Sequence, residues 1–267
     1  MVMTRFHLVV LFFIANLFYV NAQEGWQVEV MPGVAVYRGD LSQGPFSLKS
    51  VGPGANVNLK YDNGDMVVVR AGLGWGMLKG DDRDSKKADL RSRNLSFKTM
   101  LYEFSLSAEV NLLDPEAYYG YPYLMTGIGL FHFDPYAYDK NNKKVRLQPL
   151  STEGQGLPEY PGRKKYSLTQ AYIPFGGGWK YNVKGQYMLS FELAVRYLFT
   201  DYLDDVSKTY ISKSVLLNRK GQTAVDMAFR QTPSPNEGDV RGNPDSKDFY
   251  IMSGVKLTWF LNKKKTH

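Results

Sequence analysis

Apolar and polar residues alternate strictly along three long segments of the chain. The clearest is 99–112, where every second residue is apolar and Glu103 and Glu109 lie among the residues between. Segments 66–77 and 187–199 repeat the pattern. Because successive side chains of a strand point to opposite faces, a period of two predicts long strands with one apolar and one polar face.

Five further segments show the same alternation less regularly: 26–37, 51–61, 121–133, 168–181 and 248–260. All eight predicted strands exceed the usual length of about five or six residues in globular proteins. A tilted strand that crosses a membrane needs about 9–11 residues. An even number of such strands predicts an all-β fold, an eight-stranded antiparallel up-and-down transmembrane β-barrel.

The connections between the predicted strands alternate in length. Short links follow the second, fourth and sixth strands, at 62–65, 113–120 and 182–186, and the first of them contains the hairpin signal Asp62-Asn63-Gly64. Long links follow the odd-numbered strands, at 38–50, 78–98, 134–167 and 200–247. Outer-membrane barrels combine short periplasmic turns with long outer loops. We therefore expect both chain ends at the periplasmic rim.

The polar faces of the predicted strands carry both signs of charge. The acids are Glu29, Glu103, Glu109 and Glu192, and the bases are Lys60, Arg70, Lys180, Arg196 and Lys256. Because the interior of an eight-stranded barrel is just filled by side chains, this set predicts a closed lumen held by opposite charges rather than a diffusion channel. Replacing one member, as in Arg70→Leu, is expected to leave a buried carboxylate unpaired.

A soluble eight-stranded barrel of the lipocalin type is the alternative fold, because alternation alone does not say which face points inwards. Three features favour the membrane barrel: the strand length, the mixed charges of the polar faces, and aromatic residues near strand ends. Membrane barrels carry such aromatics in two girdles. The candidates are Trp26, Tyr37, Tyr61, Tyr102, Tyr121, Phe131, Phe133, Tyr181, Phe199, Phe249 and Trp259.

The first residues are typical of a targeting segment rather than of part of the fold. Arg5 precedes an apolar core at 8–20, and Ala22 offers a small residue for cleavage, which predicts a signal peptide over 1–22. Residues 23–267 then form a single barrel domain, located in the outer membrane. The chain contains no cysteine, which excludes disulfides and thiolate chemistry, and its net charge of +7 suits anionic lipid.

Candidate chemistry is sparse. His132 is the one histidine away from the chain ends, and no Ser or Asp spacing around it indicates a catalytic triad. Asp201, Asp204 and Asp205 form an acidic cluster without a calcium-loop spacing. We expect no catalytic residue, cofactor or metal site. Basic loop residues are candidates for lipopolysaccharide phosphates: Lys79, Arg83, Lys86, Lys87, Arg91 and Arg93 in one loop, and Lys140, Lys143, Lys144, Arg163, Lys164 and Lys165 in another.

Six segments resemble a known family: 33–41 (GVAVYRGDL), 122–133 (PYLMTGIGLFHF), 148–156 (QPLSTEGQG), 173–178 (IPFGGG), 196–207 (RYLFTDYLDDVS) and 248–259 (DFYIMSGVKLTW). Together they are similar to PorG, the outer-membrane barrel component of the type IX secretion system of Bacteroidota. The segment 196–207 is the most specific of them. The resemblance implies a non-enzymatic protein that anchors or assembles a periplasmic ring of a PorK-like lipoprotein and a PorN-like protein, with no nucleic acid partner.

The periplasmic turns offer limited surface for such a ring. The turn 113–120 is the largest, and its Tyr118 and Tyr119 are the candidate partner contact, because tyrosine is enriched at interface hot spots. The competing interpretation places both tyrosines in the inner aromatic girdle. For function, the alternative to a secretion component is a stand-alone barrel that acts through its loops, as a lipid-modifying enzyme or as an adhesin.

Overall fold

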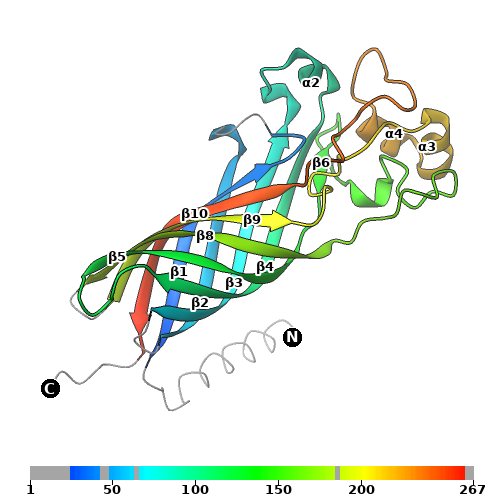
Figure 1. Ribbon diagram of the computed structural model, residues 1–267. Coiled ribbons are helices and arrows are strands. Elements are labelled where there is room, and N and C mark those ends of the chain that lie inside the picture. Colours follow the sequence, from blue (N-terminus) through cyan, green and yellow to red (C-terminus); the bar gives the residue numbers. More distant parts are fainter. Residues whose placement is uncertain (1–24, 43–47, 63–65, 184–186, 262–267) are drawn as a thin grey trace, which may run out of the picture.

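Eight long antiparallel strands close into one barrel (Figure 1). The computed structural model describes residues 25–42, 48–62, 66–183 and 187–261. Each strand pairs with its neighbours in the barrel, and β1 pairs with β10 to complete the ring. The strands are β1 (Trp26–Arg38), β2 (Val51–Asp62), β3 (Val67–Asp81), β4 (Ser96–Asn111), β5 (Gly120–His132), β8 (Thr169–Val183), β9 (Tyr187–Leu198) and β10 (Phe249–Phe260).

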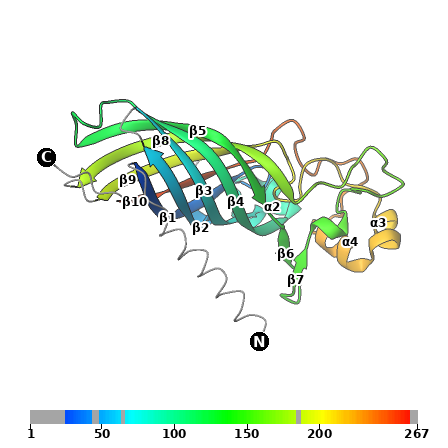
Figure 2. The same ribbon diagram turned by 90° about the horizontal axis from the view of Figure 1, so that it is seen from below.

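This architecture confirms the predicted fold class, and each predicted segment corresponds to one strand of the barrel. The short and long connections alternate as expected, so one end of the barrel carries only short turns and the other carries the long loops. Strand β1 begins and strand β10 ends at the short-turn end (Figures 1 and 2). The predicted signal peptide lies outside the described residues, as do parts of the turns at 63–65 and 184–186.

The long connections contain secondary structure that the alternation pattern did not predict. It comprises the hairpin β6 (Tyr136–Tyr138) and β7 (Lys144–Arg146), the helices α2 (Ala88–Arg93), α3 (Lys213–Lys220) and α4 (Gln222–Ala228), and the single turns η1 (Leu48–Ser50), η2 (Asp82–Asp84) and η3 (Gln148–Leu150). Among the described residues, no helix is long and apolar enough to cross a bilayer. We call the connections 82–95, 133–168 and 199–248 together the loop cap.

The outer wall of the barrel is apolar. Side chains on alternate positions of every strand point outwards and stay exposed in the isolated chain, such as Leu73 at 65% and Ile128 at 68%. Their neighbours along each strand point inwards and are buried, including the charged residues of the predicted polar faces. A contiguous apolar surface of this kind requires apolar surroundings, which fits a membrane barrel and not a soluble one.

Four of the predicted girdle aromatics are instead inside the barrel. Tyr37, Tyr121, Phe131 and Phe133 are at most 2% exposed. The register explains the error, because residues opposite one another in a sheet share a face: Phe131 is opposite the inward-facing Glu103. Other candidates do lie on the outer wall, among them Tyr102, Tyr181, Phe199 and Trp259. Position near a strand end was therefore an insufficient criterion without the phase of the alternation.

The interior changes character along the barrel axis. In the short-turn half it is polar and charged. In the loop half it is an apolar and aromatic core, in which barrel residues such as Tyr37 and Phe131 pack with Leu203 and Met227 of the loop cap. A second core within the cap is formed by Leu157, Ile211, Leu216, Ala224, Val225 and Ala228. The cap is thus a folded layer that continues the core of the barrel.

Candidate functional site: a closed lumen beneath a folded loop cap

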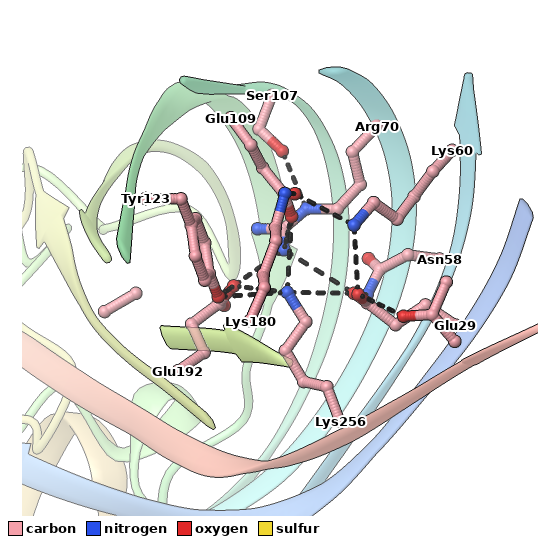
Figure 3. Close-up of polar contacts among 12 residues, drawn as sticks. Glu29, Asn58, Lys60, Arg70, Ser107, Glu109, Tyr123, Lys180, Glu192 and Lys256 are labelled. Atoms are coloured by element: carbon pink, nitrogen blue, oxygen red, sulfur yellow. Dashed lines mark hydrogen bonds and ion pairs between the residues drawn. The ribbon is translucent and has the colours of Figure 1, made fainter. Parts of the chain in front are cut away.

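Seven charged side chains meet inside the short-turn half of the barrel (Figure 3). Glu109 on β4 is at their centre. Its carboxylate oxygens lie 2.6 Å from Lys180 Nζ, 2.8 Å from Lys60 Nζ, 3.1 Å from Arg70 Nη1 and 3.2 Å from Lys256 Nζ. One buried carboxylate therefore contacts four cations that come from four other strands.

Glu29 and Glu192 complete this lumen cluster. Lys256 Nζ lies 3.1 Å from Glu29 and 2.8 Å from Glu192, and Arg70 Nη1 also lies 2.8 Å from Glu192. Neutral groups satisfy part of the remaining hydrogen-bonding capacity, because Asn58, Tyr123 and Thr258 donate to these two carboxylates. With three carboxylates against four cations, the cluster carries one excess positive charge when all members are ionised.

The other two predicted lumen residues form a separate pair closer to the loop end. Arg196 Nε lies 3.7 Å from Glu103, whose carboxylate also accepts hydrogen bonds from Tyr250 at 2.6 Å and Tyr172 at 3.0 Å. All nine predicted lumen residues are thus buried, seven in one cluster and two beside it.

The expected consequence of Arg70→Leu is contradicted by this geometry. Without Arg70, Glu109 keeps three lysines and Glu192 keeps Lys256 at 2.8 Å, so no carboxylate of the cluster loses every cation. The reason is that each carboxylate has several partners rather than one. The side chains cross-link most of the barrel strands through the lumen, and the apolar core lies above them. The lumen is therefore filled, as expected for eight strands.

The loop cap is held by a second group of buried charges, centred on Glu153. Its carboxylate accepts hydrogen bonds from the backbone N–H groups of Ser207 and Lys208, both at 3.0 Å, and from Arg241 Nη1 at 2.8 Å. Arg241 also donates to the backbone oxygen of Asp205 at 2.6 Å. Glu153 therefore links the segment 133–168 to two distant parts of the segment 199–248. This role of Glu153 was not predicted from the sequence.

Two of the three acids in the predicted acidic cluster, Asp204 and Asp205, belong to two separate hydrogen-bonded groups. Asp205 accepts hydrogen bonds from Thr152 at 2.5 Å and Tyr166 at 2.7 Å. Asp204 accepts from Tyr37 at 2.5 Å, and the same hydroxyl lies 3.1 Å from Asp248. These two carboxylates are thus engaged with loop and barrel donors, whereas the buried carboxylate of Asp201 accepts no hydrogen bond from the described residues. Among the described residues, no three His, Asp or Glu side chains converge as metal ligands.

Several acids of the cap have raised pKa values. Burial raises the pKa of Asp201 to about 7, with further contributions from nearby Asp40 and Glu153, and it raises the pKa of Asp205 to about 6. The pKa of Asp248 also lies well above its usual range, because of burial and then the proximity of Asp204 and Asp201. The folded cap therefore binds protons more tightly than the unfolded chain does.

We expect the local stability of the cap to fall as pH rises. A carboxyl whose pKa is raised on folding stabilises the fold fully below its unfolded value near 3.8, and this contribution is lost as pH rises to the folded value, about 7 for Asp201. Hydrogen-exchange protection of the Ser207 and Lys208 amides, corrected for intrinsic exchange, should be greater at pH 5 than at pH 8. Asp201→Asn should reduce this difference. Equal protection at both pH values would contradict the prediction.

The remaining sequence candidates lie apart from one another. His132 is exposed near the loop end of β5, with Nδ1 2.9 Å from Thr169 Oγ1. Of the twelve basic loop residues, Arg93 is buried against Asp82 at 2.7 Å, and Arg163 donates to the backbone oxygens of Glu153 and Thr209. These two arginines stabilise the cap. Lys79 at the loop end of β3, Arg83 in the connection after it and Lys140 in the connection before β8 come together in one groove.

The candidate partner contact lies at the short-turn end, in the connection between β4 and β5. Tyr118 is 53% exposed and Tyr119 is 77% exposed, and Leu112 and Leu113 beside them are exposed as well. The turn is ordered by Asp114, whose backbone oxygen accepts hydrogen bonds from the N–H groups of Ala117 and Tyr118. The tyrosines are thus presented on a defined turn between β4 and β5, at the opposite end of the barrel from the loop cap (Figure 1).

A closed eight-stranded barrel with an apolar outer wall and a charged, filled lumen defines the class of outer-membrane β-barrel proteins. The chain belongs to the family described as "Domain of unknown function (DUF6089)", whose model matches residues 5–216. No curated protein sequence matches it.

Solved outer-membrane proteins are similar in fold at low sequence identity. Neisserial surface protein A has a TM-score of 0.46 and 10% identity, covering 89% of this chain and 97% of that chain. A major outer membrane protein from Thermus thermophilus has a TM-score of 0.42 and 12% identity, covering 88% and 100%. Ail of Yersinia pestis has a TM-score of 0.40 and 9% identity, covering 89% and 100%. The assignment of the barrel rests on the strand pairing of this chain itself.

Proposed function

We propose that this protein is a non-enzymatic outer-membrane component of the type IX protein secretion system, and that it anchors or assembles a periplasmic ring of PorK-like and PorN-like proteins. The observation that carries the proposal is the filled lumen, since a barrel without a passage acts through its surfaces. The resemblance to PorG in 196–207 and in five other segments points to a secretion machine as the partner. A signal peptide over 1–22 and both chain ends in the periplasm belong to the same proposal.

The contact surface that we propose is the turn with Tyr118 and Tyr119. Two exposed tyrosines beside Leu112 and Leu113 form an amphipathic patch at the rim that faces the periplasm in the proposed orientation. Buried tyrosines commonly dominate the energy of protein interfaces. The competing role, in the inner aromatic girdle, predicts that the same residues serve insertion into the membrane.

Replacing both tyrosines, as Tyr118→Ala with Tyr119→Ala, separates these roles. Under the contact role, the barrel inserts and shows heat-modifiable migration in gels, but PorK-like and PorN-like proteins no longer copurify and secretion falls. Under the girdle role, insertion itself fails. The matched control is Tyr181→Ala with Tyr187→Ala, which removes two outward tyrosines of the neighbouring strands β8 and β9 at the same end of the barrel.

The control should leave copurification intact. If deletion of the whole gene leaves protein export and ring assembly unchanged, the anchoring role is wrong.

A further inference from the structure

Two lysines lie directly opposite each other at the loop end of the barrel wall. Lys79 on β3 pairs in register with Lys98 on β4, and both belong to the outward-facing set of their strands. Like charges that face each other across neighbouring strands are destabilising. Within the described part of the chain, neither lysine forms an ion pair. Their arrangement suits an external anion that lies between them.

The two lysines line a groove of about 780 Å³ between the barrel wall and the loop cap. The hairpin of β6 and β7 forms one side, with Tyr138 and Lys140, and the segment after α4 contributes Arg230. Tyr138 is 41% exposed, and Lys98 Nζ lies 5.5 Å from the centre of its ring. The groove thus combines cations with an accessible aromatic ring, the combination with which proteins hold a charged sugar.

Arg230 is partly buried in this groove without a carboxylate at ion-pair distance among the described residues. Its guanidinium donates to Ser96 Oγ at 3.1 Å and to the backbone oxygen of Tyr138 at 3.0 Å. Burial lowers the pKa of Arg230, which means that its charge is incompletely compensated by the protein. An arginine held by neutral acceptors keeps donors available for a phosphate, to which guanidinium groups bind in a bidentate manner.

Two of the four acids that line the groove pair with other basic residues, and the other two accept hydrogen bonds from neutral groups. Asp81 pairs with Arg83 at 2.6 Å, and Asp84 pairs with Lys49 at 2.8 Å. Asp139 accepts backbone N–H groups of its own turn, and Asp226 accepts from Gln222. Four basic residues therefore have no ion-pair partner in the described part of the chain, and they come from four separate segments: Lys79, Lys98, Lys140 and Arg230.

The position of the groove along the strands, just beyond the apolar part of the outer wall, indicates whether the anion belongs to a lipid or to a soluble molecule. Along β3 and β4, the outward rows are Trp75 with Tyr102, then Met77 with Met100, and then Lys79 with Lys98. Successive rows on one face are separated by about 7 Å. An interfacial aromatic row followed by an apolar row and a cationic row places the lysines where the phosphates of a lipid headgroup lie. A soluble anion would not require this continuity with the wall.

We propose that the groove binds the phosphorylated sugar headgroup of an outer-leaflet glycolipid, with its acyl chains along the outer wall of β3 and β4. Lys79 and Lys98 contact one phosphate, Arg230 and Lys140 contact the headgroup from the cap side, and Tyr138 lies against the sugar. The site does not depend on the proposed contact with ring proteins, since it lies at the opposite end of the barrel from Tyr118 and Tyr119, but its place in the outer leaflet rests on the proposed orientation.

The test uses the full mature protein, folded in zwitterionic detergent micelles, with diphosphorylated lipid A as the probe. Native mass spectrometry and titration should show a retained lipid A, and Lys79→Gln with Lys98→Gln should weaken its binding about tenfold or more. The matched control is Lys213→Gln with Lys220→Gln, which removes two exposed lysines of α3 outside the groove and should change binding less than twofold. Heat-modifiable migration verifies that every variant is folded.

Arg230→Gln gives an independent test, because it removes a cation from the cap side of the groove, and it should also weaken binding. Dephosphorylated lipid A should bind at least tenfold more weakly than the phosphorylated form. Equal binding of the two forms, or equal loss in the control variant, overturns the proposal. Binding of a soluble phosphorylated sugar as tightly as lipid A overturns the assignment to a lipid.

Discussion

Glu109→Gln is expected to be the most destabilising conservative substitution in the lumen. Glu109 contacts four cations. Among the described residues, it is the only ion-pair partner of Lys180, at 2.6 Å. Glutamine has nearly the same shape but no charge, so two carboxylates would remain for four buried cations. Breaking a buried ion pair in this way costs about 3–5 kcal/mol. Urea unfolding in lipid vesicles, followed by tryptophan fluorescence, measures the loss.

The matched control removes a cation instead of the central anion. Lys180→Met leaves three carboxylates facing Lys60, Arg70 and Lys256, and so removes the excess positive charge of the cluster. We expect this variant to be far less destabilised than Glu109→Gln, or to be more stable than the original chain, because replacing buried charge by apolar volume is often neutral or stabilising. If Lys180→Met is the more damaging of the two, the lumen does not depend on Glu109 as its centre.

The strands were predictable from sequence because each of them has a membrane-facing and a lumen-facing side. The lipid and the polar interior impose opposite requirements on successive residues, as in 99–112, and this imposes a period of two over the full strand length. For the same reason the charged lumen residues could be named. Their pairing could not be named, because it depends on the shear of the barrel, which places Lys180 beside Glu109 across the lumen.

The loop cap was not predictable by the same reasoning. Its segments are short, they lack a long period, and they are held by contacts between residues far apart in the chain, such as Glu153 with Arg241. The segments 148–156 and 196–207 gave the available signal, since both were singled out by the resemblance, and Thr152 and Glu153 of the first contact Asp205 and Ser207 of the second. Because both segments carry the family resemblance, they are candidates for contact with each other. This contact could have been predicted from the sequence.

The error over the aromatic residues has the same origin. Tyr37 and Phe131 are near strand ends, but the loop half of the interior is an apolar core that continues into the cap. A barrel interior that is polar throughout would have no place for them. The inward-facing aromatic residues of the loop half thus indicate that the long loops fold onto the barrel rather than extend from it.

A second large effect is expected from Glu153→Gln in the loop cap. Glu153 is fully buried, and its carboxylate accepts two backbone N–H groups and Arg241 Nη1. The amide of glutamine has one acceptor oxygen, so its NH₂ group would face one of these donors. Arg241 would keep only the more distant carboxylate of Asp205, at 3.8 Å. We expect local opening of the cap to become easier by about 3–5 kcal/mol, while the barrel below stays folded.

Protease treatment of intact cells measures this opening and the orientation of the barrel together. The original chain should be cut slowly, because its cap is a packed layer, and Glu153→Gln should be cut rapidly within 133–168 or 199–248 while the barrel keeps its heat-modifiable migration. Glu237→Gln is the matched control, because Glu237 is exposed and its hydrogen bond from Tyr160 lies at the surface. Equal cutting of the two variants would show that Glu153 does not hold the cap. If Glu153→Gln is cut only after the outer membrane is permeabilised, the cap faces the periplasm and the proposed orientation is reversed.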